Sequence, residues 1–261
     1  MSSRPVALVT GASAGLGEQF ANLFARDGHD VILVARSAAR LEPIAERLRH
    51  HNVTLHVMPE DLSKPGAAER LYKAVKAKGL EVGFLVNNAG FGSNGPFLEL
   101  PVEKEVEMVE LNCTSLLELC HYFGKDMAAR KTGRILNIAS TAGFQAGPYM
   151  ATYYATKAFV VSFTEALAHE LKDSGVTVTC HCPGATATEF AGRAGNDSSR
   201  LFQRPGIAKA QDVALHAYES MMEGEVLAVH GLLNWVSMQA VRVSPRAVLR
   251  TIAAALNSKP E

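Results

Sequence analysis

The sequence has no excess of either charge. Its 261 residues include 26 lysines and arginines and 26 aspartates and glutamates, for a formal net charge of zero. A chain without net charge has no long-range field to attract nucleic acid or an anionic membrane, so we expect neither as a partner. Long hydrophobic runs are also missing, since none approaches the roughly 18 apolar residues that span a bilayer. No apolar leader precedes the first strand-like run, which indicates a cytoplasmic protein.

Cysteine is scarce, and the four that occur do not form a metal-binding pattern. Cys113 and Cys120 lie in a helical stretch, whereas Cys180-His181-Cys182 ends an apolar strand-like run. Side chains alternate across a strand, so Cys180 and Cys182 would share one face and His181 the other, and no second ligand pair follows. Four buried thiols are therefore favoured over a metal site.

Short apolar runs alternate with longer helical patterns from one end of the chain to the other. The runs are continuous and rich in valine, isoleucine and leucine, as in parallel strands that are covered on both faces. Right-handed crossovers between such strands build an open doubly wound sheet. The sequence therefore predicts an α/β fold of the Rossmann type, with a mostly parallel seven-stranded sheet and helices on both faces, in a single domain over 1–261.

The positions of these elements follow from the same pattern. Strands are expected at Val6–Thr10, Val31–Ala35, Val53–Met58, Phe84–Val86, Arg134–Ala139, Val176–His181 and Glu225–Val229. Helices are expected near Leu16–Asp27, Ala39–His50, Ala67–Lys78, Val102–Arg130 and Tyr153–Asp173. Pro43 is expected to disturb the first turns of the second helix.

Two segments depart from this alternation. Thr188–Ala210 is polar and rich in glycine but contains Phe190, Leu201 and Phe202, so we expect residues 188–210 to form a lid over an apolar substrate rather than a plain surface loop. Residues 230–261 form a tail that is expected to be helical. The tail could pack on its own domain, cover the substrate site, contact a second subunit or lie on a membrane surface. A substrate or subunit contact is favoured, and the membrane least.

The first strand runs directly into a glycine-rich turn, Gly11-Ala12-Ser13-Ala14-Gly15-Leu16-Gly17, which is followed by a helix. Such a turn presents unpaired N–H groups and the positive end of the helix dipole to a pyrophosphate. A glycine turn can also be purely structural. Its place at the first strand–helix junction nevertheless indicates a dinucleotide site. The residues expected to bind the cofactor there are Gly11, Ser13, Gly15, Leu16 and Gly17.

The end of the second strand indicates which dinucleotide binds. An acidic residue at this place would bind the adenosine ribose of NAD, whereas a basic residue accommodates the 2′-phosphate of NADP. Here the strand ends in Arg36-Ser37, Arg40 follows, and no acidic residue is present. These arginines could be ordinary solvated charges, but the absence of an acidic residue and the presence of basic residues both favour NADP. We expect NADP as the cofactor, with NAD less favoured.

Tyr153 and Lys157 lie four residues apart at the start of a helical stretch, so they share a helix face while Tyr154 points elsewhere. An ammonium beside a phenol is expected to lower its pKa from about 10 and to make a usable acid–base pair. An exposed helical pair is the alternative. Ser140 ends the preceding buried strand, where ligands of a doubly wound sheet bind, and can donate to a substrate carbonyl oxygen.

These motifs together resemble the short-chain dehydrogenase/reductase family in its compact form. The match comprises Thr10-Gly11-x-x-x-Gly15-x-Gly17, Asn87-Asn88-Ala89-Gly90, Asn112, Ser140, Tyr153-x-x-x-Lys157 and Pro183-Gly184, in the family's order over residues 6 to about 190. The tail is similar to that of a bacterial subset of the family. The pattern departs from many members after the last strand, where His230-Gly231 replaces a Gly-Gly turn.

The resemblance implies a role for each matching residue. Tyr153 would exchange a proton with the substrate oxygen, Lys157 would lower the tyrosine pKa and hold the nicotinamide ribose, Ser140 would orient the substrate, and Asn112 would support a water relay. Further cofactor contacts are implied for Asp61, Leu62, Asn88, Ala89, Gly90, Pro183, Gly184, Thr186 and Thr188. Several of these residues could equally serve in turns or caps.

The sequence thus predicts an NADP-dependent oxidoreductase that acts on a carbonyl or secondary alcohol. Phe91, Phe144, Tyr149, Met150, Phe190 and Phe202 could line an apolar substrate pocket or fill the core. An NADP-binding sensor or regulatory protein is the alternative, although the intact Tyr–Lys pair favours an enzyme. An epimerase or dehydratase on the same scaffold is a lesser alternative. By analogy with the family, a homodimer or homotetramer is expected, paired through the helices beginning near Val102 and Tyr153.

Overall fold

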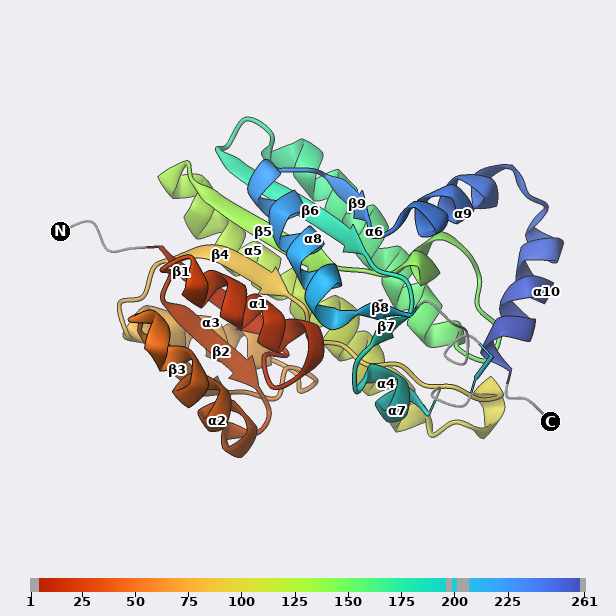
Figure 1. The fold of residues 1–261 in the computed structure, drawn as a ribbon, viewed down its shortest axis with the longest axis horizontal. Coiled ribbons are helices and arrows are strands. Elements are labelled where there is room, and N and C mark those ends of the chain that lie inside the picture. The colour runs from red at the N-terminus through yellow and green to blue at the C-terminus, as the bar shows by residue number, and fades with distance from the viewer. Residues whose placement is uncertain (1–4, 196–198, 201–206, 259–261) are drawn as a thin grey trace.

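The computed structural model describes residues 5–195, 199–200 and 207–258, and a parallel sheet of seven strands lies at the centre of this part of the chain (Figure 1). The strands are β1 (Val6–Thr10), β2 (Val31–Ala35), β3 (Leu55–Pro59), β4 (Val82–Asn87), β5 (Gly133–Ile138), β6 (Val176–Cys182) and β9 (Leu227–Val229). Their order across the sheet is β3-β2-β1-β4-β5-β6-β9, which confirms the predicted doubly wound arrangement. The winding reverses between β1 and β4, and this reversal opens a crevice at the carboxyl ends of the strands.

Helices cover both faces of the sheet because alternate strand residues are apolar on both sides. In β1, Ala7 and Val9 pack with one group of helices, and Val6 and Leu8 pack with the other. The first group is α1 (Gly15–Arg26), α2 (Ala38–Leu48) and α8 (Ala210–Glu223). The second group is α3 (Ala67–Ala77), α5 (Ser115–Arg130) and α6 (Ala151–Leu171).

Two predictions about helices are corrected by the structure. The expected single helix over 102–130 consists of α4 (Val102–Val109), a π-helical turn at Glu110–Thr114 and then α5. A wider turn inside a helix redirects the side chains that it carries, and such turns are common at functional sites. Pro43 does not disturb α2, which continues through it. The other predicted elements are present, with ends that differ by a few residues.

The described part of the segment after β6 contains short strands and a short helix. β7 (Thr186–Ala187) pairs in parallel with β8 (Ala208–Lys209), and α7 (Phe190–Ala194) lies between them in the sequence. The expected lid is therefore not a plain loop. The predicted contributions of Leu201 and Phe202 lie outside the described residues.

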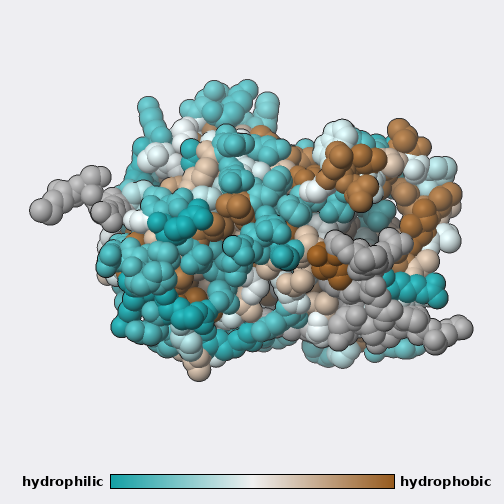
Figure 2. Space-filling model, viewed as in Figure 1, coloured by the Kyte–Doolittle hydropathy of each residue, from teal (hydrophilic) through white to brown (hydrophobic). Residues whose placement is uncertain are grey.

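The predicted helical tail consists of α9 (Leu232–Val243) and α10 (Arg246–Asn257), which extend beyond the edge of the sheet (Figure 1). Apolar residues gather on the surface of this part of the molecule, whereas most of the same face is polar (Figure 2). Leu232 and Leu233 are 76% and 84% exposed. No helix in the described ranges is both long and apolar enough to cross a bilayer.

The cysteines follow the strand alternation predicted for them. The Sγ atoms of Cys180 and Cys182 lie 3.8 Å apart, whereas His181 faces the opposite side of β6 and contacts His216 across 3.0 Å between ring nitrogens. All four cysteines are free and buried, which confirms the prediction of buried thiols.

The hydroxyl of Thr10 joins β1 to the end of β4 at the point where the winding reverses. Thr10 is buried, and its Oγ1 donates to Val86 O (3.1 Å) and accepts from the backbone nitrogens of Asn88 (2.9 Å) and Ala89 (3.0 Å). The Asn88 side chain in turn donates to Thr10 O (2.9 Å). Buried polar groups with this many partners are costly to disrupt, so these bonds fix the geometry of the crevice.

Replacing Thr10 by Val should therefore lower the free energy of unfolding by about 1–3 kcal/mol, since one buried and two half-buried backbone groups lose their hydrogen bonds to the Thr10 hydroxyl. Urea denaturation monitored by circular dichroism would measure the change. Thr179→Val is the matched control, because Thr179 is buried in β6 and its Oγ1 has no hydrogen-bond partner among the described residues. The control should leave stability unchanged or raise it. Equal losses in the two variants would contradict this account.

Candidate active site

A cavity of about 1290 Å³ opens at the carboxyl ends of the central strands. Every predicted site residue lines it except Gly17 and Asn112, which lie directly behind its wall. The cavity extends from the glycine-rich turn at one end to α9 and α10 at the other. Residues far apart in the sequence thus meet in one continuous site.

The glycine-rich turn is shaped for close approach of a ligand to its backbone. Gly11 has φ +66°, and a Cβ there would lie 2.9 Å from Asn88 Nδ2. A Cβ on Gly17 would lie 2.2 Å from Gly11 O, so only glycine lets α1 pack this tightly on the turn. Ala14, which precedes α1, offers no side-chain cap to the first N–H groups of the helix. These donors face the crevice and suit the phosphates of a dinucleotide.

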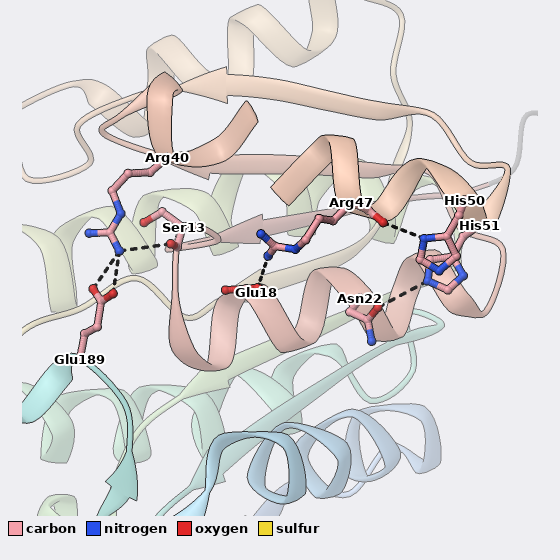
Figure 3. Close-up of polar contacts among 8 residues, drawn as sticks. All are labelled: Ser13, Glu18, Asn22, Arg40, Arg47, His50, His51 and Glu189. Carbon is pink, nitrogen blue, oxygen red and sulfur yellow. Dashed lines mark hydrogen bonds and ion pairs between the residues drawn. The ribbon is translucent and has the colours of Figure 1, made fainter. Parts of the chain in front are cut away.

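The adenosine end of the cavity carries the two predicted arginines. Arg36 is exposed in the cavity wall, and its guanidinium makes no hydrogen bond or ion pair with any described residue. Arg40 instead donates to both carboxylate oxygens of Glu189 and lies 3.4 Å from Ser13 O (Figure 3). Asp61 also lines the cavity, while its Oδ1 accepts from the Ser63 backbone and hydroxyl. One arginine is therefore available to a ligand and the other is engaged.

Ser140, Tyr153 and Lys157 meet at the middle of the cavity. Ser140 follows β5, and its Oγ accepts from Ala142 N (3.1 Å) and donates to Pro183 O (3.4 Å). Lys157 is buried on α6, donates to Ile138 O (2.7 Å) and lies 5.8 Å from the centre of the Tyr153 ring. The helix spacing that suggested a shared face for Tyr153 and Lys157 is thus realised.

The pKa of Tyr153 differs from the prediction. Burial raises the pKa of Tyr153 well above its usual value, and the neighbouring Ser140 hydroxyl lowers it only in part. Lys157 lies over the ring and donates to a backbone carbonyl, so the predicted lowering of the pKa of Tyr153 by Lys157 is wrong for this arrangement. Burial also lowers the pKa of Lys157, to about 8. At neutral pH the phenol therefore holds its proton and the amine is mostly charged.

Asn112 acts on the site through its neighbours. Its amide donates to Phe91 O (3.0 Å) and Thr156 Oγ1 (3.1 Å) and accepts from Phe91 N (3.2 Å), and it is buried in the π-helical turn. Asn112 thereby ties the segment after β4 to α6. A Cβ on Gly90 would lie 3.0 Å from Asn112 Oδ1 and 3.7 Å from Lys157 Nζ, so the three residues are close neighbours.

The wall beside Tyr153 is apolar. Phe91, Phe144, Met150 and Phe190 line the cavity as predicted, and the Phe190 ring lies 5.2 Å from that of Tyr153. Tyr149 does not line the cavity, because its backbone has a positive φ of 66° and its side chain is 42% exposed. The predicted contribution of Phe202 lies outside the described residues.

The tail also lines this cavity. Along the wall lie Asn234, Met238 and Val241 of α9 and Leu249, Ile252 and Leu256 of α10. Asn257 is fully buried and holds the end of the tail, since it bonds to Tyr154 Oη (3.3 Å), Pro148 O (3.0 Å) and Asn94 Nδ2 (2.9 Å). From the sequence, a substrate or subunit contact is favoured for this helical tail, without a residue-by-residue assignment.

This strand order, with a glycine-rich turn beside the reversal point and Ser140, Tyr153 and Lys157 in one cavity, defines a nucleotide-binding oxidoreductase. The sequence model of the short chain dehydrogenases matches residues 5–199, and the chain belongs to this family.

Relatives of known activity and structure agree with this assignment. The 7beta-hydroxysteroid dehydrogenase of Collinsella aerofaciens is 34% identical over 182 residues, 69% of this chain and 68% of that protein. The very-long-chain 3-oxoacyl-CoA reductase of Neurospora crassa is 36% identical over 176 residues, 66% of this chain and 53% of that protein. The chain spans about half the length of such reductases. The structure of a short-chain dehydrogenase from Sphingobium yanoikuyae in complex with NADPH has a TM-score of 0.82 at 33% identity, with 91% of this chain and 93% of that chain covered.

The buried state of Lys157 predicts a pH dependence of stability. The pKa of Lys157 falls from 10.5 to about 8 on folding, so between these values the unfolded chain binds a proton that the folded chain has released. Stability attributable to Lys157 should therefore rise as the pH increases from 8 to 10.5. Urea denaturation of the protein and of Lys157→Met would measure it, because other titrating groups are common to both. A difference in unfolding free energy that stays constant over this range would contradict the prediction.

Proposed function

We propose that this protein is an NADP-dependent oxidoreductase that interconverts a ketone or other carbonyl and the corresponding alcohol on a substrate with a large apolar body. The observation that carries the proposal is the meeting of Ser140, Tyr153 and Lys157 between a glycine-rich turn and an apolar wall in one cavity. Two relatives are named for large apolar substrates, one for a hydroxysteroid and the other for a very-long-chain acyl group. The alternative of a sensor or regulatory protein finds no support in these relatives.

The residues that line the cavity fit a dinucleotide along its length. The turn over Gly11–Gly17 and the start of α1 would hold the pyrophosphate, Arg36 and Ser37 a 2′-phosphate, and Asp61 and Leu62 the adenine. Asn88, Ala89, Gly90, Pro183, Gly184, Thr186 and Thr188 would line the remaining length, and the buried ammonium of Lys157 would donate to the nicotinamide ribose hydroxyls. When bound, the nicotinamide exchanges a hydride with the substrate carbon.

Proton transfer is the task of the chain itself. Since burial raises the pKa of Tyr153, its phenol is protonated at neutral pH and can donate to the carbonyl oxygen during reduction. Ser140 would orient that oxygen, since it lines the same cavity as Tyr153 and its hydroxyl lowers the pKa of Tyr153. Asn112 would hold the backbone at Phe91 against Thr156 of α6.

We further propose that residues 188–210 act as a lid and that residues 230–261 complete the substrate wall, within a single domain over 1–261. The direct contact of Phe190 with Tyr153 supports the lid. Exposed apolar side chains on α4, α5 and α6, namely Val102, Val106, Val109, Leu117 and Phe159, support pairing of two subunits through these helices in a homodimer or homotetramer. Cytoplasmic residence completes the proposal.

Replacing Tyr153 by Phe should lower kcat at least about 100-fold, because the proton donor is lost, while NADPH binding stays within about twofold. The assay follows nicotinamide absorbance with a panel of bulky apolar ketones and with sugar phosphates, and binding is measured by nicotinamide fluorescence. Tyr154→Phe is the matched control, since Tyr154 points away to Asn257, and it should keep kcat within about tenfold. Unchanged turnover in Tyr153→Phe would refute the mechanism, and better turnover of sugar phosphates would refute the substrate class.

The protein should bind NADPH more tightly than NADH, and Arg36→Asp should reduce the ratio of the two affinities about tenfold or reverse it. The reason is that a carboxylate in this position repels the 2′-phosphate and accepts from ribose hydroxyls. Fluorescence titration with both dinucleotides measures the ratio. Arg49→Asp, an exposed change outside the crevice, serves as control. Equal affinities in the unaltered protein would show that NADP is not preferred.

A further inference from the structure

Glu189 and Arg40 join two segments that the sequence separates by 149 residues. Arg40 lies on α2, in the wall predicted to bind the 2′-phosphate, and Glu189 immediately precedes α7. A single nitrogen, Arg40 Nη2, lies 2.9 Å and 2.8 Å from the two carboxylate oxygens of Glu189, and 3.4 Å from Ser13 O (Figure 3). The ion pair therefore crosses the crevice beside the glycine-rich turn.

This ion pair is placed where it can be exchanged for another anion. The side chains of Arg40 and Glu189 are 44% and 54% exposed, and exposed ion pairs of this kind contribute little to stability. A phosphate group carries more charge than a carboxylate and offers three oxygens to a guanidinium. Arg36, nearby at the end of β2, makes no hydrogen bond or ion pair with any described residue and can join in binding the same phosphate. A carboxylate left beside that phosphate would repel it.

The residues on either side of Glu189 also touch the site. Thr188 packs on the glycine-rich turn, since a Cβ on Gly15 would lie 3.1 Å from Thr188 Cγ2. Phe190 packs on Tyr153 and lies close to Gly92. Three successive residues thus contact the pyrophosphate turn, the adenosine arginine and the proposed proton donor. Glu189 thus lies between a residue that packs on the glycine-rich turn and a residue that packs on Tyr153.

We propose that Glu189 is a specificity-determining residue. Its carboxylate is paired with Arg40 when no 2′-phosphate is present, and the 2′-phosphate of NADP displaces it from Arg40. A dinucleotide without this phosphate leaves the ion pair in place. Glu189 therefore lowers the affinity for NADP and reduces the ratio of the affinities for NADP and NAD. It also makes release of the start of α7 depend on the 2′-phosphate. This inference rests on the proposed NADP preference and adds a competing carboxylate to it.

The experiment is a double-mutant cycle on binding. Dissociation constants of NADPH and NADH are measured by nicotinamide fluorescence at low ionic strength for the unaltered protein, Glu189→Gln, Arg40→Gln and the double variant. Glu189→Gln should tighten NADPH binding about two- to fivefold and leave NADH within about 1.5-fold. Arg40→Gln should weaken NADPH binding, and Glu189→Gln should tighten it less in the Arg40→Gln background than in the unaltered protein, because the competition for Arg40 is then absent.

Glu46→Gln is the matched control, because it removes another exposed glutamate–arginine pair of α2, that with Arg49, outside the cavity. It should leave both affinities unchanged. If Glu189→Gln weakens the binding of both dinucleotides equally, the ion pair instead helps to hold the pyrophosphate that they share, and the proposal is overturned. An unchanged NADPH affinity overturns it as well. Failure of the NADP preference itself would appear separately, as equal NADPH and NADH affinities in the unaltered protein.

A second measurement follows the opening of α7 rather than the affinity for the dinucleotides. Hydrogen exchange of the amides in Phe190–Ala194 should increase on binding of NADPH relative to NADH, because only the former displaces Glu189 from Arg40. In Glu189→Gln this difference between the two dinucleotides should disappear. A difference that persists in Glu189→Gln would show that the segment responds to the cofactor by another route, against the proposal.

Discussion

The close approach of the glycine-rich turn to the end of β4 is the constraint on which the rest of the site depends. Gly11 and Gly17 permit it because a Cβ at either position would collide with neighbouring backbone or with Asn88. The Thr10 hydroxyl and the Asn88 amide then lock the two strands together. This junction is where the sheet reverses its winding, so the crevice exists only as long as the junction holds.

Burial has opposite consequences for the two ionisable groups at the centre of the site. It raises the pKa of Tyr153 and lowers that of Lys157, since in each case it disfavours the charged form. At neutral pH the phenol of Tyr153 therefore keeps its proton, and the Lys157 amine, with a pKa of about 8, is still mostly charged. Ser140 lies between the end of β5 and the start of α6 and is the residue that most directly opposes the effect of burial on Tyr153.

The two ends of the cavity are closed by segments that come late in the chain. Thr188, Glu189 and Phe190 contact the glycine-rich turn, Arg40 and Tyr153 in turn, and α9 and α10 supply much of the apolar wall. Asn257 secures the tail through hydrogen bonds to three separate parts of the wall. Elements from the second half of the chain therefore line both ends of the cavity, beside the glycine-rich turn and beside Tyr153.

The sequence by itself determined the sheet, the glycine-rich turn and the grouping of Ser140, Tyr153 and Lys157. These features depend on local periodicity, on positions that only glycine can occupy, and on the rule that ligands bind at the carboxyl ends of parallel strands. Tertiary structure alone decided that Arg40 pairs with Glu189, that a π-helical turn presents Asn112, that Asn257 anchors the tail and that Lys157 bonds to Ile138 O. Each of these depends on contacts between distant segments and on the degree of burial, which no local pattern of residues specifies.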